Sequence, residues 1–248
     1  MTKSNIAIVG ESRLAQDLRD LAQAKGVEVR LLPGLGDIAA TTPLVIETWV
    51  GDSEKKKLVL QKLDEFLSPA SVILTACLTH STTELASWTK HPDRIVGFAS
   101  FYPLKDRKII ELAAGLQSGV TAMNAAEQLF DSLGKQTIRV KDSAGLTFPR
   151  ILSLIINEAA RALEEGVASA EEIDIAMKLG VNYPEGPLRW ADQIGLDEVL
   201  AVLEGLQRET GEDRYRPAPL IKKLVSAGFL GETHGKGFYS YNESQVKP

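Results

Sequence analysis

Residues 6–18 read Ile-Ala-Ile-Val-Gly-Glu-Ser-Arg-Leu-Ala-Gln-Asp-Leu, and their pattern is the clearest indication of how the first half of the chain folds. Four apolar residues in a row end at Gly10, and Leu14 and Leu18 then recur on one face of a helix. The stretch predicts a buried strand, a tight turn and an amphipathic helix, the order in which parallel α/β sheets are built.

The same alternation continues to about residue 140. Ser81 with Glu84 three residues later has the pattern of a capping box that opens a short helix. We predict an α/β Rossmann-like N-terminal domain whose mostly parallel sheet is covered on both faces. Further strands are expected near 27–32, 44–46, 72–74, 95–98, 109–112 and 137–140, and helices near 54–66 and 121–133.

After Asp142 the pattern changes to helices only. Apolar residues recur at helical spacing up to the stop at Gly166, and Ser169 with Glu172 forms a second capping box. We therefore predict an all-α C-terminal domain. Its helices are expected over 150–165, from Ser169 to Gly180, from Asp197 to Gly211, and over 219–227.

Composition narrows the class of protein. The 248 residues carry a net charge of -5, with cations scattered among anions, which argues against a nucleic-acid footprint or a polybasic membrane patch. The apolar run that ends at Gly10 is too short for a signal peptide, and no stretch approaches bilayer length. Cys77 is the single cysteine, so no intramolecular disulfide forms. We expect a soluble, cytoplasmic protein whose partners are small molecules or proteins.

Several segments resemble one enzyme family. Leu-Val-Ile-Glu at 44–47 is similar to a segment of that family's first domain, and the similarity is more specific in the second half. The chain resembles the 3-hydroxyacyl-CoA dehydrogenases, including the 3-hydroxybutyryl-CoA dehydrogenases. The segments that carry the resemblance are Val140-Lys141-Asp142-Ser143-Ala144-Gly145, Gly180-Val181-Asn182-Tyr183-Pro184-Glu185-Gly186-Pro187, Gly195-Leu196-Asp197 and Gly235-Lys236-Gly237-Phe238-Tyr239.

The resemblance implies an activity in fatty acid metabolism: the NAD-linked oxidation of a 3-hydroxyacyl-CoA to the 3-ketoacyl form, a step of beta-oxidation. It implies a shortened Rossmann-like NAD-binding-type domain at 1–141 and the family's helical dimerisation domain at 142–248. The implied partners are an acyl-CoA-type small molecule and a second subunit, either a copy of this chain or an active paralogue. The resemblance implies no nucleic-acid or membrane partner and no metal.

The candidate cofactor residues follow the glycine turn. The dinucleotide fingerprint Gly-x-Gly-x-x-Gly falls on Gly10, Ser12 and Ala15, so only the first glycine is kept, and the acidic residue that would bind ribose is replaced at about Pro33. Either this turn still binds NAD or it only ends a strand. Lys56 falls on the lysine that contacts the cofactor in the family, while the accompanying glutamate is replaced by Gly51.

The candidate catalytic residues lack one member of the pair that the family uses. In the family, the histidine of His-Phe-Phe-Asn-Pro takes the proton of the 3-hydroxyl, and a glutamate orients it. This chain has Ala99-Ser100-Phe101-Tyr102-Pro103, and the glutamate is kept as Glu111. Glu111 is thus an inherited catalytic residue without its base, or a solvated carboxylate at a strand end. The family's substrate-positioning asparagine is replaced by Pro149, which suits the first turn of a helix.

Other groups are candidates to replace the base. His80 and Tyr102 are the candidate catalytic substitutes, and the Thr79 hydroxyl is the candidate substrate contact. Cys77 is either a thiolate nucleophile or a small core residue. About ten residues separate the second strand from Leu44, where the family has a long helical excursion that contributes to the acyl-CoA site. Three hypotheses remain: a weak family dehydrogenase, a non-catalytic dimerising or regulatory subunit, and an enzyme for another substrate.

Overall fold

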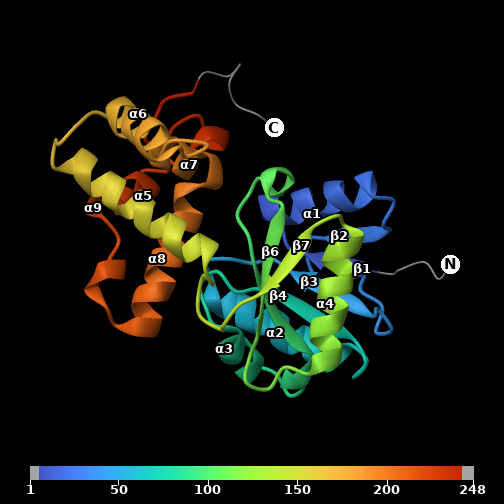
Figure 1. The fold of residues 1–248 in the computed structure, drawn as a ribbon. Coiled ribbons are helices and arrows are strands. Elements are labelled where there is room, and N and C mark those ends of the chain that lie inside the picture. The colour runs from blue at the N-terminus through green and yellow to red at the C-terminus, as the bar shows by residue number, and fades with distance from the viewer. Residues whose placement is uncertain (1–5, 242–248) are drawn as a thin grey trace. The chain divides into compact units, whose positions relative to one another are not determined.

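The short apolar runs of the first half form one sheet. The computed structural model describes residues 6–241, and the chain divides into two compact units, Met1–Phe148 and Pro149–Pro248. The sheet order is β2-β1-β3-β4-β5-β6-β7, and every neighbouring pair is parallel except β5 with β6 (Figure 1). The predicted mostly parallel sheet is confirmed. The strands are β1 (Ile6–Val9), β2 (Val29–Leu32), β3 (Leu44–Glu47), β4 (Val72–Ala76), β5 (Ile95–Ala99), β6 (Ile109–Ala114) and β7 (Gln136–Arg139).

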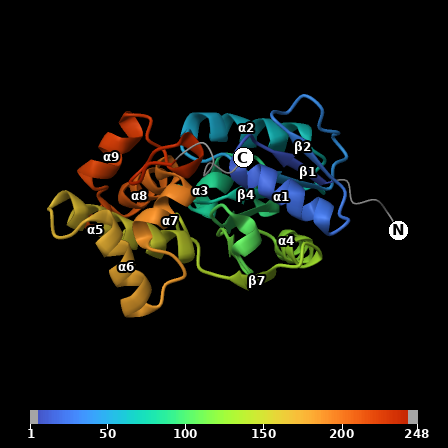
Figure 2. The ribbon, with the colours of Figure 1, turned by 90° about the horizontal axis from the view of Figure 1, so that it is seen from above.

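Helices cover both faces of this sheet. Figure 2 shows α2 on one side of the strands and α4 on the other. Ser81 accepts a hydrogen bond from the Glu84 N–H and so caps α3, as its sequence pattern predicts. Two 3-10 helices, η1 and η2, lie in the connections of this unit. The helices of this unit are α1 (Arg13–Ala24), α2 (Ser53–Phe66), α3 (Thr82–Ser87) and α4 (Val120–Ser132), with η1 (Pro92–Arg94) and η2 (Leu104–Asp106).

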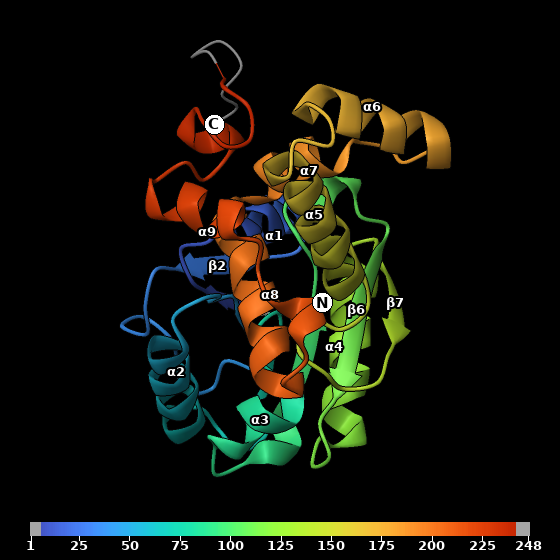
Figure 3. The ribbon, with the colours of Figure 1, turned by 90° about the vertical axis from the view of Figure 1, so that its left-hand side faces the viewer.

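The second unit is helical, as predicted. Within it α6 packs against α7, α7 against α8, and α8 against α9, which can be followed in Figure 3. The capping box of Ser169 and Glu172 is present at the start of α6. The helix α7, which Pro187 opens after Gly186, is not among the helices predicted from the sequence. The helices are α5 (Phe148–Glu164), α6 (Ala170–Val181), α7 (Pro187–Ile194), α8 (Leu196–Thr210) and α9 (Pro219–Ser226), with η3 (Asp213–Tyr215) and η4 (Glu232–His234).

The Gly-Lys-Gly-Phe-Tyr segment after η4 is held by a buried carboxylate. Asp192 of α7 accepts hydrogen bonds from the Phe238 and Tyr239 N–H groups and from the Tyr241 hydroxyl. A Cβ on Gly237 would lie 2.0 Å from an Asp192 oxygen, so only glycine lets the backbone approach so closely. Burial is the main cause that raises the pKa of Asp192, to about 6, and the hydrogen bonds oppose it.

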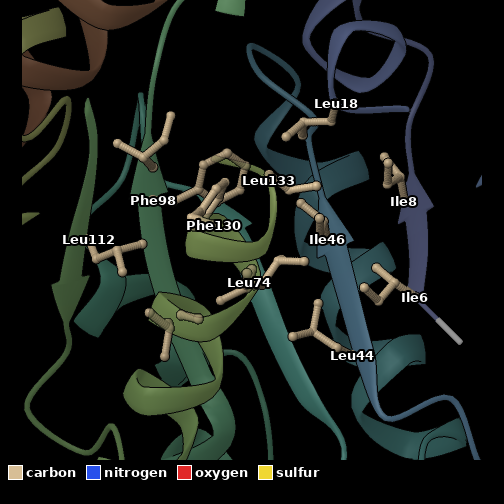
Figure 4. Packing of buried hydrophobic residues seen from close by; sticks show 14 of the residues in the cluster. Ile6, Ile8, Leu18, Leu44, Ile46, Leu74, Phe98, Leu112, Phe130 and Leu133 are labelled. Atoms are coloured by element: carbon tan, nitrogen blue, oxygen red, sulfur yellow. The ribbon is translucent and has the colours of Figure 1, made fainter. Parts of the chain in front are cut away.

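The main core of the first unit lies on the α1 and α4 face of the sheet. Ile8, Leu74, Phe98 and Leu112 point into it, and the ring of Phe98 lies 5.7 Å from that of Phe130 (Figure 4). Because side chains alternate along a strand, the residues between them point to the opposite face. That opposite face carries Glu47 on β3, Thr75 on β4, Ala99 on β5 and Glu111 on β6.

Two kinds of feature are absent from the described residues. No helix within residues 6–241 is long and apolar enough to cross a membrane. Over the same range, no group of three histidine, cysteine, aspartate or glutamate side chains is arranged to hold a metal ion.

Candidate functional site

The turn after β1 is a glycine turn that leads into the N-terminus of α1. Gly10 has a φ of 141°, and a Cβ there would lie 2.2 Å from the Thr48 hydroxyl. Ser12 is the N-cap of α1: its hydroxyl accepts from the Ala15 N–H at 3.2 Å and donates to Thr48 at 3.1 Å. The glycine turn and the first turn of α1 therefore fit a pyrophosphate, because a helix N-terminus presents N–H groups and partial positive charge. Ser12 already satisfies one of those N–H groups.

The ribose end of a dinucleotide finds no carboxylate at the expected position. β2 ends at Leu32, and Pro33 and Gly34 follow it. An acidic side chain at this point is what binds the ribose hydroxyls in a Rossmann domain. The fit to NAD thus rests on Gly10 and the start of α1.

Lys56 is engaged inside the protein. Its Nζ lies 2.5 Å from Glu47 Oε2 and donates to the Trp49 carbonyl at 2.9 Å. The Thr75 hydroxyl also donates to Glu47, at 2.5 Å, and the Trp49 N–H donates to its other oxygen. Lys56 is 1% exposed and Glu47 is fully buried, so this ion pair joins the end of β3 to α2 beneath the surface. The lysine that sequence assigns to the cofactor has its charge balanced by Glu47.

His80 is also held by protein partners. Its Nδ1 lies 2.8 Å from the Thr79 hydroxyl, its Nε2 lies 3.1 Å from the Ser53 hydroxyl, and its ring packs edge-on against Trp88. Only 3% of His80 is exposed. Both ring nitrogens are within hydrogen-bond distance of hydroxyls, so the imidazole joins the start of α2 to the loop after β4.

Cys77 is a core residue. It is fully buried, and its thiol donates to the Phe98 carbonyl at 3.2 Å. Burial raises the pKa of the thiol well above its ordinary value, which disfavours the thiolate. The packing interpretation of Cys77 is confirmed.

Ala99 and Glu111 are partners in the antiparallel register of β5 and β6. Glu111 is 6% exposed and accepts hydrogen bonds from the Thr147 N–H at 2.7 Å and the Phe148 N–H at 3.0 Å. The interpretation of Glu111 as a solvated strand-end carboxylate is therefore wrong, because the two amides that open α5 fix its position. Burial, the larger cause, raises the pKa of Glu111, and these two amide hydrogen bonds oppose the rise.

A pocket of about 270 Å³ opens beside this pair. Its floor includes Ala99 and Ser100, both 3% exposed, and Glu111 contributes the buried carboxylate. Aliphatic and aromatic side chains form the walls, and charged residues of the segment before β6 also line it. The full lining is Ala99, Ser100, Asp106, Arg107, Lys108, Ile109, Glu111, Ile138 and Phe148.

Tyr102 and Ser100 have different environments. The guanidinium of Arg13 lies 4.7 Å from the centroid of the Tyr102 ring, a cation–π contact between the start of α1 and the loop after β5. The Ser100 hydroxyl donates to the Phe101 carbonyl at 3.4 Å. Tyr102 is therefore a packing partner of Arg13.

Two carboxylates with structural contacts, the buried Glu47 and the half-buried Asp142, were not predicted from the sequence. Glu47 stands at the end of an apolar strand, nine residues before Lys56, and this pattern is a sequence signal of a buried ion pair. Asp142 accepts from the Thr82 N–H at 2.6 Å and the Thr83 N–H at 2.8 Å and so caps α3 from a distant segment. No local sequence pattern predicts the contact of Asp142 with the start of α3.

Comparison with known proteins agrees with this architecture. Residues 11–143 match the family model of the NAD binding domain of 3-hydroxyacyl-CoA dehydrogenases, and residues 145–241 match the model of their C-terminal domain. The chain belongs to the 3-hydroxyacyl-CoA dehydrogenase family. The 3-hydroxybutyryl-CoA dehydrogenase of Clostridioides difficile is 41% identical over 200 residues, which cover 81% of this chain and 71% of the relative.

Solved structures of the dehydrogenase family have the same fold. The crystal structure of M. tuberculosis FadB2 has a TM-score of 0.86 at 26% identity and covers 98% of this chain and 100% of its own. The (S)-3-hydroxybutyryl-CoA dehydrogenase PaaH1 from Ralstonia eutropha has a TM-score of 0.77 at 33% identity, with the same coverage of both chains. The predicted family, fold and NAD-binding type of domain are thereby confirmed, and the 3-hydroxyacyl-CoA dehydrogenase family uses acyl-CoA substrates.

Proposed function

We propose that this chain is an NAD-linked 3-hydroxyacyl-CoA oxidoreductase in which proton transfer is strongly impaired. One observation carries the proposal: Ala99 is the register partner of the buried Glu111, so a methyl group stands where the family's base would be oriented by this carboxylate. The glutamate that orients the base in the family is kept as Glu111, and the histidine that serves as the base is absent. Glu111 remains the inherited member of the pair.

In this proposal the chain has residues for cofactor binding and for orienting a base, but no base for proton transfer. Bound NAD would accept the hydride, and Gly10, Ser12, Ala15 and the first turn of α1 would hold its pyrophosphate. Glu111 is fixed by the Thr147 and Phe148 amides. No imidazole at position 99 takes the proton from the 3-hydroxyl. A general base contributes roughly a hundredfold to ten-thousandfold in rate, so a reaction without it is slowed by about that factor.

The substrate side of the proposal is an acyl-CoA-type molecule with the Thr79 hydroxyl as a contact. The connection between β2 and β3 spans residues 33–43, which is short for the family's helical excursion. We propose that a short acyl chain is accepted and that coenzyme A is held weakly.

A second function is favoured by two buried side chains. Lys56 is paired with Glu47, and His80 lies between the hydroxyls of Thr79 and Ser53, so both side chains already have partners within the protein. These placements favour a non-catalytic subunit that dimerises with itself or with an active paralogue. Such a subunit would keep the fold and the pairing surface of the family without its turnover.

The proposed dimer surface lies on α6. Leu179 is 83% exposed, and Ile175 and Val181 of the same helix are each 55% exposed. Apolar side chains gathered on an exposed helix are typical of a protein–protein interface. We propose that residues 142–248 act as a dimerisation domain, residues 1–141 act as the NAD-binding-type domain, and the protein works in the cytoplasm.

Two measurements on the purified protein separate these functions. The first is NADH consumption with acetoacetyl-CoA, and the second is calorimetric titration of NADH alone. Slow turnover with NADH binding supports the impaired dehydrogenase. NADH binding without turnover favours an altered substrate, and the absence of both favours the subunit.

A further inference from the structure

The pocket beside Ala99 and Glu111 has the size of a small molecule. Its volume is about 270 Å³, close to the lower end of typical ligand sites, which begin at roughly 300 Å³. One water occupies about 30 Å³ of the liquid, so the space exceeds that of a single trapped water several-fold. A ring with one short substituent is the kind of ligand that this volume admits.

The Glu111 carboxylate in the pocket lining can accept a hydrogen bond from a ligand. A carboxylate offers about four acceptor positions, and the Thr147 and Phe148 amides supply donors to both oxygens of Glu111. These amides fix the carboxylate, and Glu111 lines the pocket together with its register partner Ala99. A ligand N–H or O–H beside Glu111 makes a charge-assisted hydrogen bond in a pocket that is partly shielded from water.

The walls favour a flat apolar body. Ile109 and Ile138 lie on neighbouring strands, and Phe148 adds an aromatic ring. Ile109 is 46% exposed and Ile138 is 41% exposed, so both present apolar surface that a ring would cover. An aromatic heterocycle can pack against these apolar side chains, and its ring N–H can donate a hydrogen bond to Glu111.

The charged residues of the lining favour an anionic substituent. Arg107 lies with its guanidinium 5.0 Å from the centroid of the Phe148 ring, and Lys108 is its neighbour. Asp106 offsets one of these two cations. Arginine is suited to planar carboxylates because its donors are arranged in a fork.

We infer that this pocket binds a small planar heterocycle that donates a hydrogen bond to Glu111 and carries a carboxylate toward Arg107. The inference rests on the pocket alone and not on hydride transfer. It can therefore fail while the proposed function holds, and it can hold in a subunit that never turns over.

The test uses imidazole-4-acetate as the probe, added to the whole protein without cofactor. Binding is followed in ¹H–¹⁵N spectra at the Thr147 and Phe148 amides, which donate to Glu111. The expected result is a saturable shift of both amide signals. Imidazole alone should bind more weakly, and acetate alone should leave the two signals unchanged.

Three variants locate the probe. Ala99→Val fills the floor of the pocket and should abolish saturation, while Glu111→Gln should weaken both imidazole compounds about tenfold, since a charge-assisted hydrogen bond is lost. Arg107→Met should weaken imidazole-4-acetate and leave imidazole unchanged. Thermal melting of each variant verifies that it folds. The inference is overturned if the wild-type amides do not shift, or if imidazole and imidazole-4-acetate bind equally well.

Discussion

Ala99 and Glu111 are paired across the antiparallel strands β5 and β6, on the face of the sheet opposite the main core. The register places a methyl group beside a buried carboxylate that two backbone amides hold in position. The two amides fix the orientation of this carboxylate. The proposed function takes Glu111 as the orienting partner of a base that position 99 lacks.

Because Lys56 forms a buried ion pair with Glu47, the Lys56→Met variant is expected to have a lower free energy of unfolding than the wild type. Removing one partner leaves a buried charge uncompensated, which costs about 3–5 kcal/mol of unfolding free energy. Urea denaturation measures this loss. Lys62→Met on the same helix is the matched control, because Lys62 is exposed and should change stability by less than about 0.5 kcal/mol. Equal stability of the two variants would show that Lys56 is free to serve a ligand.

The contacts of His80 predict a structural effect of its replacement. His80→Ala should lower the unfolding free energy by about 2 kcal/mol, because a buried ring and its hydrogen bonds to Thr79 and Ser53 are lost. Ser53→Ala should lower it by about 1 kcal/mol. The opposite pattern, full stability with turnover reduced a hundredfold or more, would identify His80 as the substitute base.

Asp192 predicts a pH dependence of stability. Its pKa is raised from the ordinary 3.8 to about 6, so the folded state disfavours the ionised carboxylate. The stabilisation that results is complete below pH 3.8 and is lost as pH rises through about 6. Relative to Asp192→Asn, the wild type should therefore gain about 1 kcal/mol in unfolding free energy between pH 7 and pH 5. Urea denaturation of both proteins at both pH values gives this difference, and a constant difference would contradict it.

The exposed face of α6 predicts an effect on assembly. Leu179→Asp should convert a dimer into monomers in analytical ultracentrifugation, because a charge in an apolar interface is costly to bury. Leu116→Asp is the control: Leu116 is 91% exposed and belongs to the other unit. A monomeric wild type, or equal dissociation by both variants, would remove α6 from the proposed interface.

Much of the fold could be predicted from local sequence patterns. Apolar runs marked the strands, and Ser81 and Ser169 marked two helix starts, because strand burial and helix capping depend on nearby residues. The antiparallel direction of β6 carries no such local signal. α7 was missed because its eight residues are short for a periodic pattern, although Gly186 and Pro187 mark its start.

The candidate site was predicted in part. Family motifs located Ala99 and Glu111, but their register and the amides that hold Glu111 depend on strand pairing and on a segment about 36 residues away. The partners of Lys56 and His80 are equally non-local. A side chain's position in a motif does not tell whether its charge or its hydrogen-bonding groups are already satisfied inside the protein.

The most direct test is the rate of NADH oxidation with acetoacetyl-CoA by the wild type and by Ala99→His. An imidazole at position 99 would lie opposite Glu111, so the account predicts that the variant is faster by roughly a hundredfold or more. Ala99→His with Glu111→Gln should lose much of that gain. Wild-type turnover as fast as that of Ala99→His would contradict the claim that the missing base limits this protein.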